Sequence, residues 1–195
     1  MPSYPASREI CTVGGMVANN SGGEKTLAYG KTEKYVTALK VVLEDGEEYS
    51  VVPLTKAELD LKMKQKGLEG ALYKKLFKLI KDNAKVIAEA KPDVSKNSAG
   101  YYLWNVWDGE IFDLPKLIVG SQGTLGLVTE ITFRLVRPKP HSLMAVLFLR
   151  DLDELGNIVE TIMPFKPETL ESYDDQTLKL AIRFFPQILA RAKGS

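Results

Sequence analysis

Two widely separated glycine-rich segments constrain this chain more than any other feature of its sequence. The first spans residues 12–23 and reads TVGGMVANNSGG, and the second spans residues 120–126 and reads GSQGTLG. Both follow short apolar stretches. Glycine lets main-chain N–H groups come close to a phosphate or a flat ring system. Two such segments, each containing hydroxyl and amide side chains, predict a bound cofactor.

The composition is that of a globular chain and excludes several classes of function. Of the 195 residues, 45% are hydrophobic and 26% are charged, which is ordinary for a domain with a real core. Lys plus Arg number 26 and Asp plus Glu number 25, so no strong field favours a nucleic acid or an anionic membrane. The sequence has no apolar run of membrane-spanning length, and its first residues do not show the charged-then-apolar pattern expected of a signal peptide. We expect a cytoplasmic protein.

The cysteine and histidine counts limit the chemistry further. One cysteine, Cys11, permits no internal disulfide, and one histidine, His141, excludes a metal site with two histidine ligands. His141 lies in the proline-rich stretch RPKPH, which indicates a surface loop rather than a general base. Cys11 stands beside the first glycine segment, where it is either a small buried residue or a neighbour of the cofactor. No metal site is predicted.

Hydrophobic patterns predict a mixture of strands and helices. Residues 34–43 and 48–52 are rich in β-branched and apolar residues and flank Asp45-Gly46, which predicts a β-hairpin. A helical region follows over residues 55–92, with a capping box at Thr55 and Glu58 and a helix from about 69 to 90. Residues 127–136 alternate with a period of two and predict a strand.

A second unit is predicted beyond the prolines at 138 and 140. Its apolar runs and helix-start signals favour a β-α-β-α series, which is too small to close a sheet well by itself. The predicted elements are a strand at 143–149, a helix at 151–163, a strand at 169–173 and a helix at 177–193 interrupted near Pro186.

Three ordered motifs resemble the FAD-linked oxidase family, the vanillyl-alcohol-oxidase type of flavoprotein with a PCMH-type FAD-binding domain. The motifs are residues 6–46, with Tyr29-Gly30 and Asp45-Gly46 after the first glycine segment, then KNSAGY at 96–101, then GSQGTLGLVTE at 120–130. Within that family the chain resembles D-lactate dehydrogenases and the flavin subunit of glycolate oxidase. It looks like a fragment of such a protein.

The resemblance implies where FAD would lie. Residues 6–12 and the two glycines after them would pass the isoalloxazine and ribityl chain, residues 19–22 would meet the flavin and pyrophosphate, and residues 122–128 would reach FAD from a neighbouring turn. The implied cofactor-binding residues are Ala6, Ser7, Cys11, Thr12, Gly14, Gly15, Asn19, Asn20, Ser21, Gly22, Gln122, Gly123, Thr124, Leu125, Gly126 and Val128. Alternatives stay open, since Gly14 or Gly126 can serve turn geometry alone and Tyr101 can be a core residue.

The resemblance also implies an architecture. The fold class is α+β, with residues 1–138 as the second subdomain of the FAD-binding domain, a mixed or antiparallel sheet flanked by helices. The helical stretch at about 55–92 is an insert, and residues 139–195 are the truncated start of an α+β cap domain. The faces left open by truncation would be apolar and exposed, which predicts self-association.

The implied activity is an FAD-dependent oxidation of a small 2-hydroxy acid, D-lactate or glycolate, by hydride transfer to flavin. This chain would supply part of the FAD site and no catalytic residue, so that alone it would be inactive and could lack FAD. The alternative is a non-catalytic subunit or scaffold that no longer binds flavin. A nicotinamide-binding βαβ unit is excluded, because residues 120–126 precede a strand whereas a dinucleotide fingerprint opens a helix.

Overall fold

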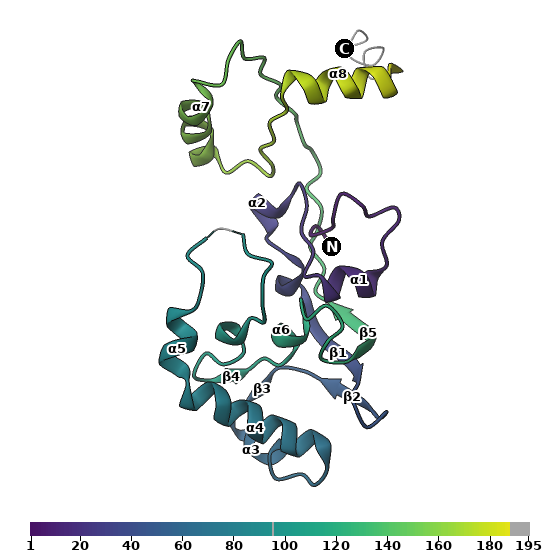
Figure 1. Cartoon of the computed structure of the whole chain (residues 1–195), viewed down its shortest axis with the longest axis vertical. Coiled ribbons are helices and arrows are strands. Elements are labelled where there is room, and N and C mark those ends of the chain that lie inside the picture. The colour runs from purple at the N-terminus through teal and green to yellow at the C-terminus, as the bar shows by residue number, and fades with distance from the viewer. Residues whose placement is uncertain (95, 188–195) are drawn as a thin grey trace.

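The computed structural model describes residues 1–94 and 96–187, whose path is traced in Figure 1. The fold is α+β, as predicted, with short helices and two small antiparallel sheets. The strands are β1 (Val36–Val42), β2 (Glu48–Val51), β3 (Leu54–Thr55), β4 (Ile111–Phe112) and β5 (Leu127–Phe133). The helices are α1 (Val13–Ala18), α2 (Thr26–Tyr29), η1 (Thr32–Lys34), α3 (Lys56–Lys62), α4 (Leu68–Asp82), α5 (Ala84–Glu89), η2 (Leu103–Asn105), α6 (Pro115–Ile118), α7 (Leu155–Ile162), η3 (Met163–Phe165) and α8 (Asp175–Phe184).

The larger sheet has the strand order β2-β1-β5, and both pairings are antiparallel. The predicted hairpin is confirmed, because β1 and β2 pair across a turn in which Gly46 has φ 81°, a conformation that suits glycine. The predicted strand at 127–136 forms as β5 and ends at Phe133. Lys40 of β1 and Glu130 of β5 form an ion pair at 2.8 Å. The central strand β1 therefore pairs with its neighbour in the sequence, β2, on one edge and with the distant strand β5 on the other.

The helical region predicted at 55–92 forms three helices, α3, α4 and α5. Thr55 caps α3 with Glu58 in the predicted capping box. The predicted single helix from 69 to 90 is wrong, because Asn83 divides it into α4 and α5. The Asn83 side-chain amide donates to the carbonyl oxygen of Leu79 at 2.8 Å, and such local bonds compete with the helical ladder.

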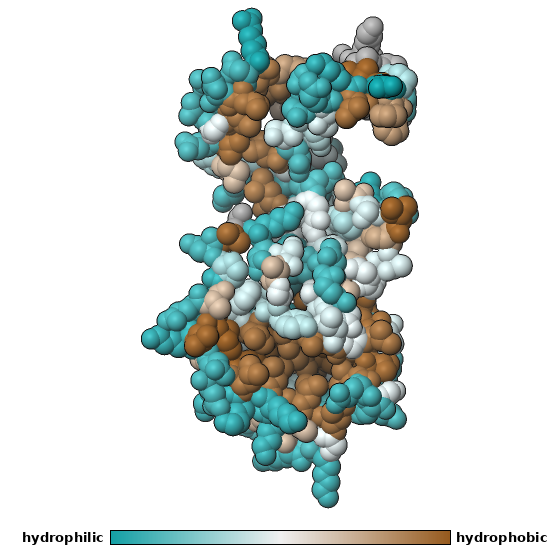
Figure 2. All heavy atoms as spheres, in the orientation of Figure 1, coloured by the Kyte–Doolittle hydropathy of each residue, from teal (hydrophilic) through white to brown (hydrophobic). Residues whose placement is uncertain are grey.

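The core lies between the sheets and α4. Phe112, Tyr73 and Leu59 are fully buried, and the Phe112 ring packs against the rings of Tyr73 and Phe77 at centroid distances of 5.8 and 6.1 Å. Burying an apolar side chain such as Phe112 or Leu59 contributes about 1.5–3 kcal/mol. Figure 2 shows apolar side chains gathered in the lower body, rimmed by hydrophilic ones.

The C-terminal part of the described chain differs from its prediction. Residues 143–149 and 169–173 form no strand, because in the part of the chain that the structure describes no strand lies beside them and a lone strand is not stable. The helix predicted at 151–163 is shorter and forms α7. The helix predicted at 177–193 forms α8 and ends before Pro186, and residues 188–193 lie outside the described residues. Among the described helices, none has the length and apolar character needed to cross a membrane.

Glu168 ties this C-terminal part to the rest of the fold. One carboxylate oxygen accepts from the hydroxyl of Tyr29 in α2 at 3.0 Å and pairs with Lys139 at 2.9 Å, and the other pairs with Lys25 at 3.4 Å. These bonds to Lys139 and Tyr29 lower the pKa of Glu168. In Figure 1, α7 and α8 lie beyond α2, on the side away from the sheets.

Candidate functional site

The two glycine segments meet at one pocket. The pocket has a volume of about 180 Å³, below the roughly 300–1,000 Å³ that whole ligand sites usually have. It can therefore hold one part of a large ligand. Its walls come from α1, the end of α6, the turn after α6 and the start of β5. The lining residues are Gly14, Gly15, Ala18, Ile118, Ser121, Gly123, Gly126, Leu127 and Val128.

Direct hydrogen bonds hold the two segments together. The main-chain N–H of Gly120 donates to the carbonyl oxygen of Val17 at 2.9 Å, and that of Gln122 donates to Ala18 at 2.9 Å. The side-chain amide of Gln122 also donates to the Asn19 side-chain oxygen at 3.1 Å. The pairing of β1 with β5 brings the second segment to this position.

Gly14 and Gly126 are glycines for different reasons. A Cβ at Gly126 would lie 2.6 Å from Cγ1 of Val41 and 2.9 Å from the carbonyl oxygen of Val42, and the residue has φ 149°. Gly126 is thus required by its packing against β1. A Cβ at Gly14 would meet no atom within 4 Å. The space beside Gly14 is open, as a site that admits a ligand requires.

Buried members of the first segment are bonded within the protein. Asn20 is 2% exposed, and its amide donates to the carboxylate of Glu33 at 2.7 Å while accepting from the Glu33 N–H at 3.0 Å. The carbonyl oxygen of Ser21 accepts from the N–H and the hydroxyl of Thr32 at 2.9 and 2.7 Å. These groups shape the segment from behind, and their polar atoms already have partners.

The N-terminal candidates form an exposed turn. Ala6 and Ser7 are exposed, and the carbonyl oxygen of Ser7 accepts from the N–H of Cys11 at 3.0 Å. Cys11 is partly exposed rather than buried, and its thiol donates to the carbonyl oxygen of Arg8 at 3.8 Å. The hydroxyl of Thr12 accepts from the Gly15 N–H at 3.0 Å and caps α1.

Of the sixteen predicted residues, the structure brings five to the pocket wall, and the other eleven do not line it. The five are Gly14, Gly15, Gly123, Gly126 and Val128. Those outside the lining are Ala6, Ser7, Cys11, Thr12, Asn19, Asn20, Ser21, Gly22, Gln122, Thr124 and Leu125. The lining also contains residues outside these sixteen, namely Ala18, Ile118, Ser121 and Leu127. Ala18 and Ser121 lie inside the two glycine segments, so the segments themselves were the signal. Leu127 lies within residues 122–128, which the resemblance places near FAD, whereas Ile118 is an apolar flanking residue without a signal of its own.

Residues 96–102 lie against the second glycine segment. Tyr101 is 45% exposed, so it is not a core residue. Its hydroxyl lies 2.7 Å from Oγ1 of Thr124. The Thr124 hydroxyl donates to the carbonyl oxygen of Ser121 at 2.5 Å, which leaves the Tyr101 hydroxyl as the donor in the first contact.

A buried lysine lies behind this loop. Burial lowers the pKa of Lys31, against the charge of Glu33, which raises it. Burial also shifts the pKa of Tyr102, which it raises, and the Tyr102 hydroxyl is 3.2 Å from Nζ of Lys31.

His141 lies in an exposed stretch, as predicted. The nine residues that line the pocket carry no ionisable side chain, so the pocket suits binding rather than acid–base or nucleophilic chemistry. Within residues 1–94 and 96–187, no cluster of potential metal ligands is found.

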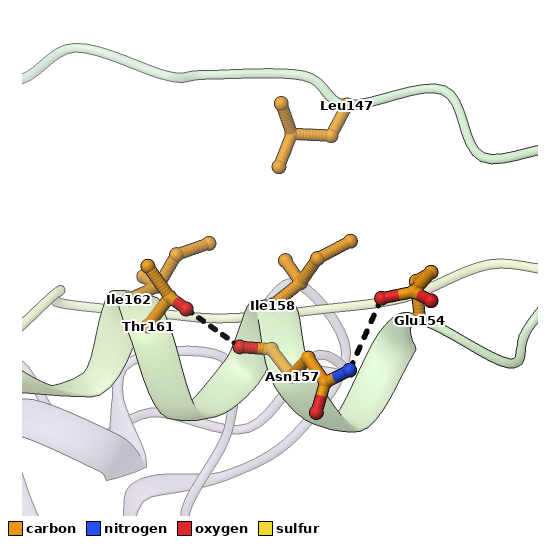
Figure 3. A pocket seen from close by; sticks show the side chains of 6 residues that line it. All are labelled: Leu147, Glu154, Asn157, Ile158, Thr161 and Ile162. Atoms are coloured by element: carbon orange, nitrogen blue, oxygen red, sulfur yellow. Dashed lines mark hydrogen bonds between the residues drawn. The ribbon is translucent and has the colours of Figure 1, made fainter.

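A second pocket of about 400 Å³ lies at α7, away from the glycine segments. Figure 3 shows Leu147 on one side of it and Ile158 and Ile162 of α7 on the other, pointing toward each other across open space. Its polar atoms are bonded locally, with the Asn157 amide donating to the Glu154 carboxylate at 3.1 Å. This pocket is an unfilled gap between apolar side chains, and none of the predicted site residues lines it.

Comparison with known proteins confirms the family resemblance. Residues 1–51 match the family model of the FAD binding domain, which supports FAD as the cofactor. The chain is 33% identical over 180 residues to glycolate oxidase subunit GlcD of Bacillus subtilis, covering 91% of this chain and 27% of the relative. It is 29% identical over 174 residues to D-2-hydroxyglutarate dehydrogenase of Pseudomonas putida, covering 88% and 17%. It is 28% identical over 180 residues to D-lactate dehydrogenase of Archaeoglobus fulgidus, covering 92% and 29%. The chain thus spans less than a third of the length of these relatives.

Proposed function

We propose that this chain forms part of the FAD site of an FAD-dependent oxidoreductase that oxidises a small 2-hydroxy acid of the D-lactate or glycolate type. The observation that carries the proposal is the pocket between the two glycine segments, with its open space beside Gly14. The comparisons support it, because the relatives are named as dehydrogenases and an oxidase subunit for D-2-hydroxyglutarate, D-lactate and glycolate.

The pocket residues fit one part of FAD. Their small side chains let the main chain approach a flat ring or a phosphate, and the hydrogen bonds of Gly120 and Gln122 hold the two walls at a fixed separation. In this proposal Gly14, Gly15 and Gly123 contact FAD directly. When bound, FAD supplies the acceptor for the hydride that leaves the hydroxyl-bearing carbon. The residues of this chain bind and orient, and we assign none of them to proton removal.

The proposed architecture follows the same resemblance. Residues 1–138 are the second subdomain of a PCMH-type FAD-binding domain, and residues 139–195 are the beginning of a cap domain. The antiparallel sheets and the helical insert support the first assignment. The change to exposed apolar residues after β5 supports the boundary.

A titration with FAD tests the proposed function. The chain is expected to retain FAD after removal of the excess, with absorption bands of oxidised flavin. Gly14→Leu places a side chain in the open space and is expected to weaken FAD binding by about tenfold or more, because overlap with the ligand must be relieved. Gly156→Leu is the matched control, since Gly156 is also a helical glycine whose Cβ would meet no atom within 4 Å. A chain that takes up no FAD would support the alternative of a non-catalytic module.

We infer in addition that the chain associates with itself through residues 143–149. Leu143, Met144 and Phe148 are 103%, 87% and 86% exposed, and exposed apolar patches of this kind mark contact surfaces. Sedimentation velocity at micromolar concentration is expected to show dimers or larger species. Phe148→Asp is expected to shift the chain to monomer, while Ala71→Asp on the exposed side of α4 is not. A monomeric parent chain contradicts the inference.

A further inference from the structure

Lys31 is a buried lysine whose three hydrogen-bond acceptors all lie on one distant loop. Lys31 is 6% exposed, and its Nζ donates to the carbonyl oxygen of Asn97, to Oγ of Ser98 at 3.0 Å and to the hydroxyl of Tyr102 at 3.2 Å. Nζ also lies 5.6 Å from the centroid of the Tyr102 ring. The ammonium group therefore gathers residues 97–102 around itself.

The surroundings of Lys31 show what this arrangement achieves. Burying a charged group costs free energy unless its hydrogen bonds are made, and among the ion pairs of the described residues none involves Lys31. Charge-assisted bonds to neutral oxygens compensate the cost, and they are stronger than bonds between neutral groups. Because all three acceptors belong to the same loop, these bonds stabilise the conformation of that loop.

The fixed loop contacts the second glycine segment through one of its own residues, Tyr101. Tyr101, adjacent to Tyr102, donates to Oγ1 of Thr124, and Thr124 donates to the carbonyl oxygen of Ser121. Ser121 lines the pocket and is 3% exposed. A continuous series of short contacts thus runs from Lys31 to the wall formed by the second glycine segment.

We propose that Lys31 is a positioning residue for the FAD site, which holds residues 97–102 so that Tyr101 braces the second glycine segment. This inference rests on the proposed function. Without Lys31, residues 97–102 and 120–126 become mobile together, and the wall that meets FAD is no longer held in place. The role is one of orientation, because Lys31 itself lies behind the loop and does not line the pocket.

Hydrogen exchange and FAD titration of the whole chain test the proposal together. Lys31→Met keeps an unbranched apolar stem and removes the charge and the donors. It is expected to raise deuterium uptake in residues 97–102 and 120–126 and to weaken FAD binding about tenfold, the equivalent of one to two lost hydrogen bonds. Lys34→Met is the matched control, an exposed lysine three residues away, and is expected to change neither measurement.

Ser98→Ala gives a second test that does not endanger folding, because Ser98 is exposed. It removes one acceptor of Lys31 and is expected to cause a smaller change, about threefold in FAD affinity, with uptake rising in the same two segments. Unchanged uptake and affinity in folded Lys31→Met and in Ser98→Ala would overturn the proposal. So would a rise in uptake spread equally over β1 and α4, which would make Lys31 a residue of general stability.

The two proposals fail in different ways. If the unmodified chain takes up no FAD, the result favours the non-catalytic module over the proposed function, and the uptake of residues 120–126 in Lys31→Met still decides whether Lys31 braces that segment. If FAD binds equally well to the parent and to Lys31→Met, the proposed function stands and the positioning role is wrong.

Discussion

The main-chain N–H of Gln122 donates to the carbonyl oxygen of Ala18 at 2.9 Å, so the second glycine segment is fastened to the end of α1. Gln122 has φ 57°, which is uncommon for a residue with a side chain. The side-chain bond from Gln122 to Asn19 reinforces the same contact. The pocket thus owes its shape to bonds between two segments that are far apart in the sequence.

Gly126→Ala is expected to destabilise the fold by roughly 1–3 kcal/mol, because the new Cβ would overlap with Val41 and the main chain of β1. Gly109→Ala is the control, since Gly109 has φ 106° and open space where the Cβ would lie. That control is expected to cost only about 1 kcal/mol from backbone strain. Urea unfolding measures both free energies, and equal losses would show that packing against β1 does not require the glycine.

The contact between Tyr101 and Thr124 is expected to contribute about 0.5–1.5 kcal/mol. A double-mutant cycle with Tyr101→Phe and Thr124→Val measures the coupling free energy from urea unfolding. The comparison cycle pairs Tyr101→Phe with Thr129→Val on β5, where additive effects are expected. Additive effects in the first cycle would mean that residues 96–102 and the second glycine segment are energetically independent.

Acidification is expected to loosen the C-terminal part from α2. The contacts of Glu168 hold its folded-state pKa below the ordinary value near 4.5, so the stabilisation is present above pH 4.5 and is lost as the pH falls through the folded-state pKa. In the parent chain, hydrogen exchange in residues 26–29 and 166–170 should rise as the pH falls through that range. In Glu168→Gln the exchange of these residues should already be raised at pH 7. Glu160→Gln, a change at an exposed glutamate of α7, should match the parent chain.

Alkaline conditions are expected to reduce the cost of burying Lys31. Its folded-state pKa lies below the ordinary value of 10.5 because burial outweighs the attraction of Glu33, with Lys96 acting in the same direction as burial. The unfolded chain therefore binds more protons between the two pKa values, and the free energy of unfolding rises with pH there. Tyr102 acts in the opposite direction above pH 10, since its pKa is raised. The difference between the parent and Lys31→Met, measured from pH 7 to 10, isolates the lysine, and parallel curves would contradict the prediction.

Local signals explain which parts of the fold were predictable. The Asp45-Gly46 turn, the Thr55–Glu58 capping box and the alternating pattern of β5 each act within a few residues, and all three are confirmed. Asn83 divides a continuous apolar pattern by a side-chain bond that hydrophobic spacing does not reveal. Residues 143–149 have the composition of a strand, but a strand also needs a neighbour.

The site was predictable only in outline. The sequence predicts that both glycine segments serve a bound cofactor, and the structure places them against one pocket. Which of their residues face it depends on the pairing of β1 with β5, which fixes the register of the second segment. Lys31 carried no signal, because its acceptors at 97–102 come together with it only through the tertiary fold.

The position of β5 beside β1 has a consequence for how the chain folds. β1 can pair with β2 as soon as residue 51 is available, but its other edge must wait for residues 127–133. Closing the long loop between β1 and β5 lowers the chain entropy before the strand contacts can offset that loss. Sheets that depend on distant partners therefore form slowly. The pocket cannot exist before that closure. A mutation that slows the joining of β5 to β1 would therefore delay cofactor capture during folding, even where the finished site is unchanged.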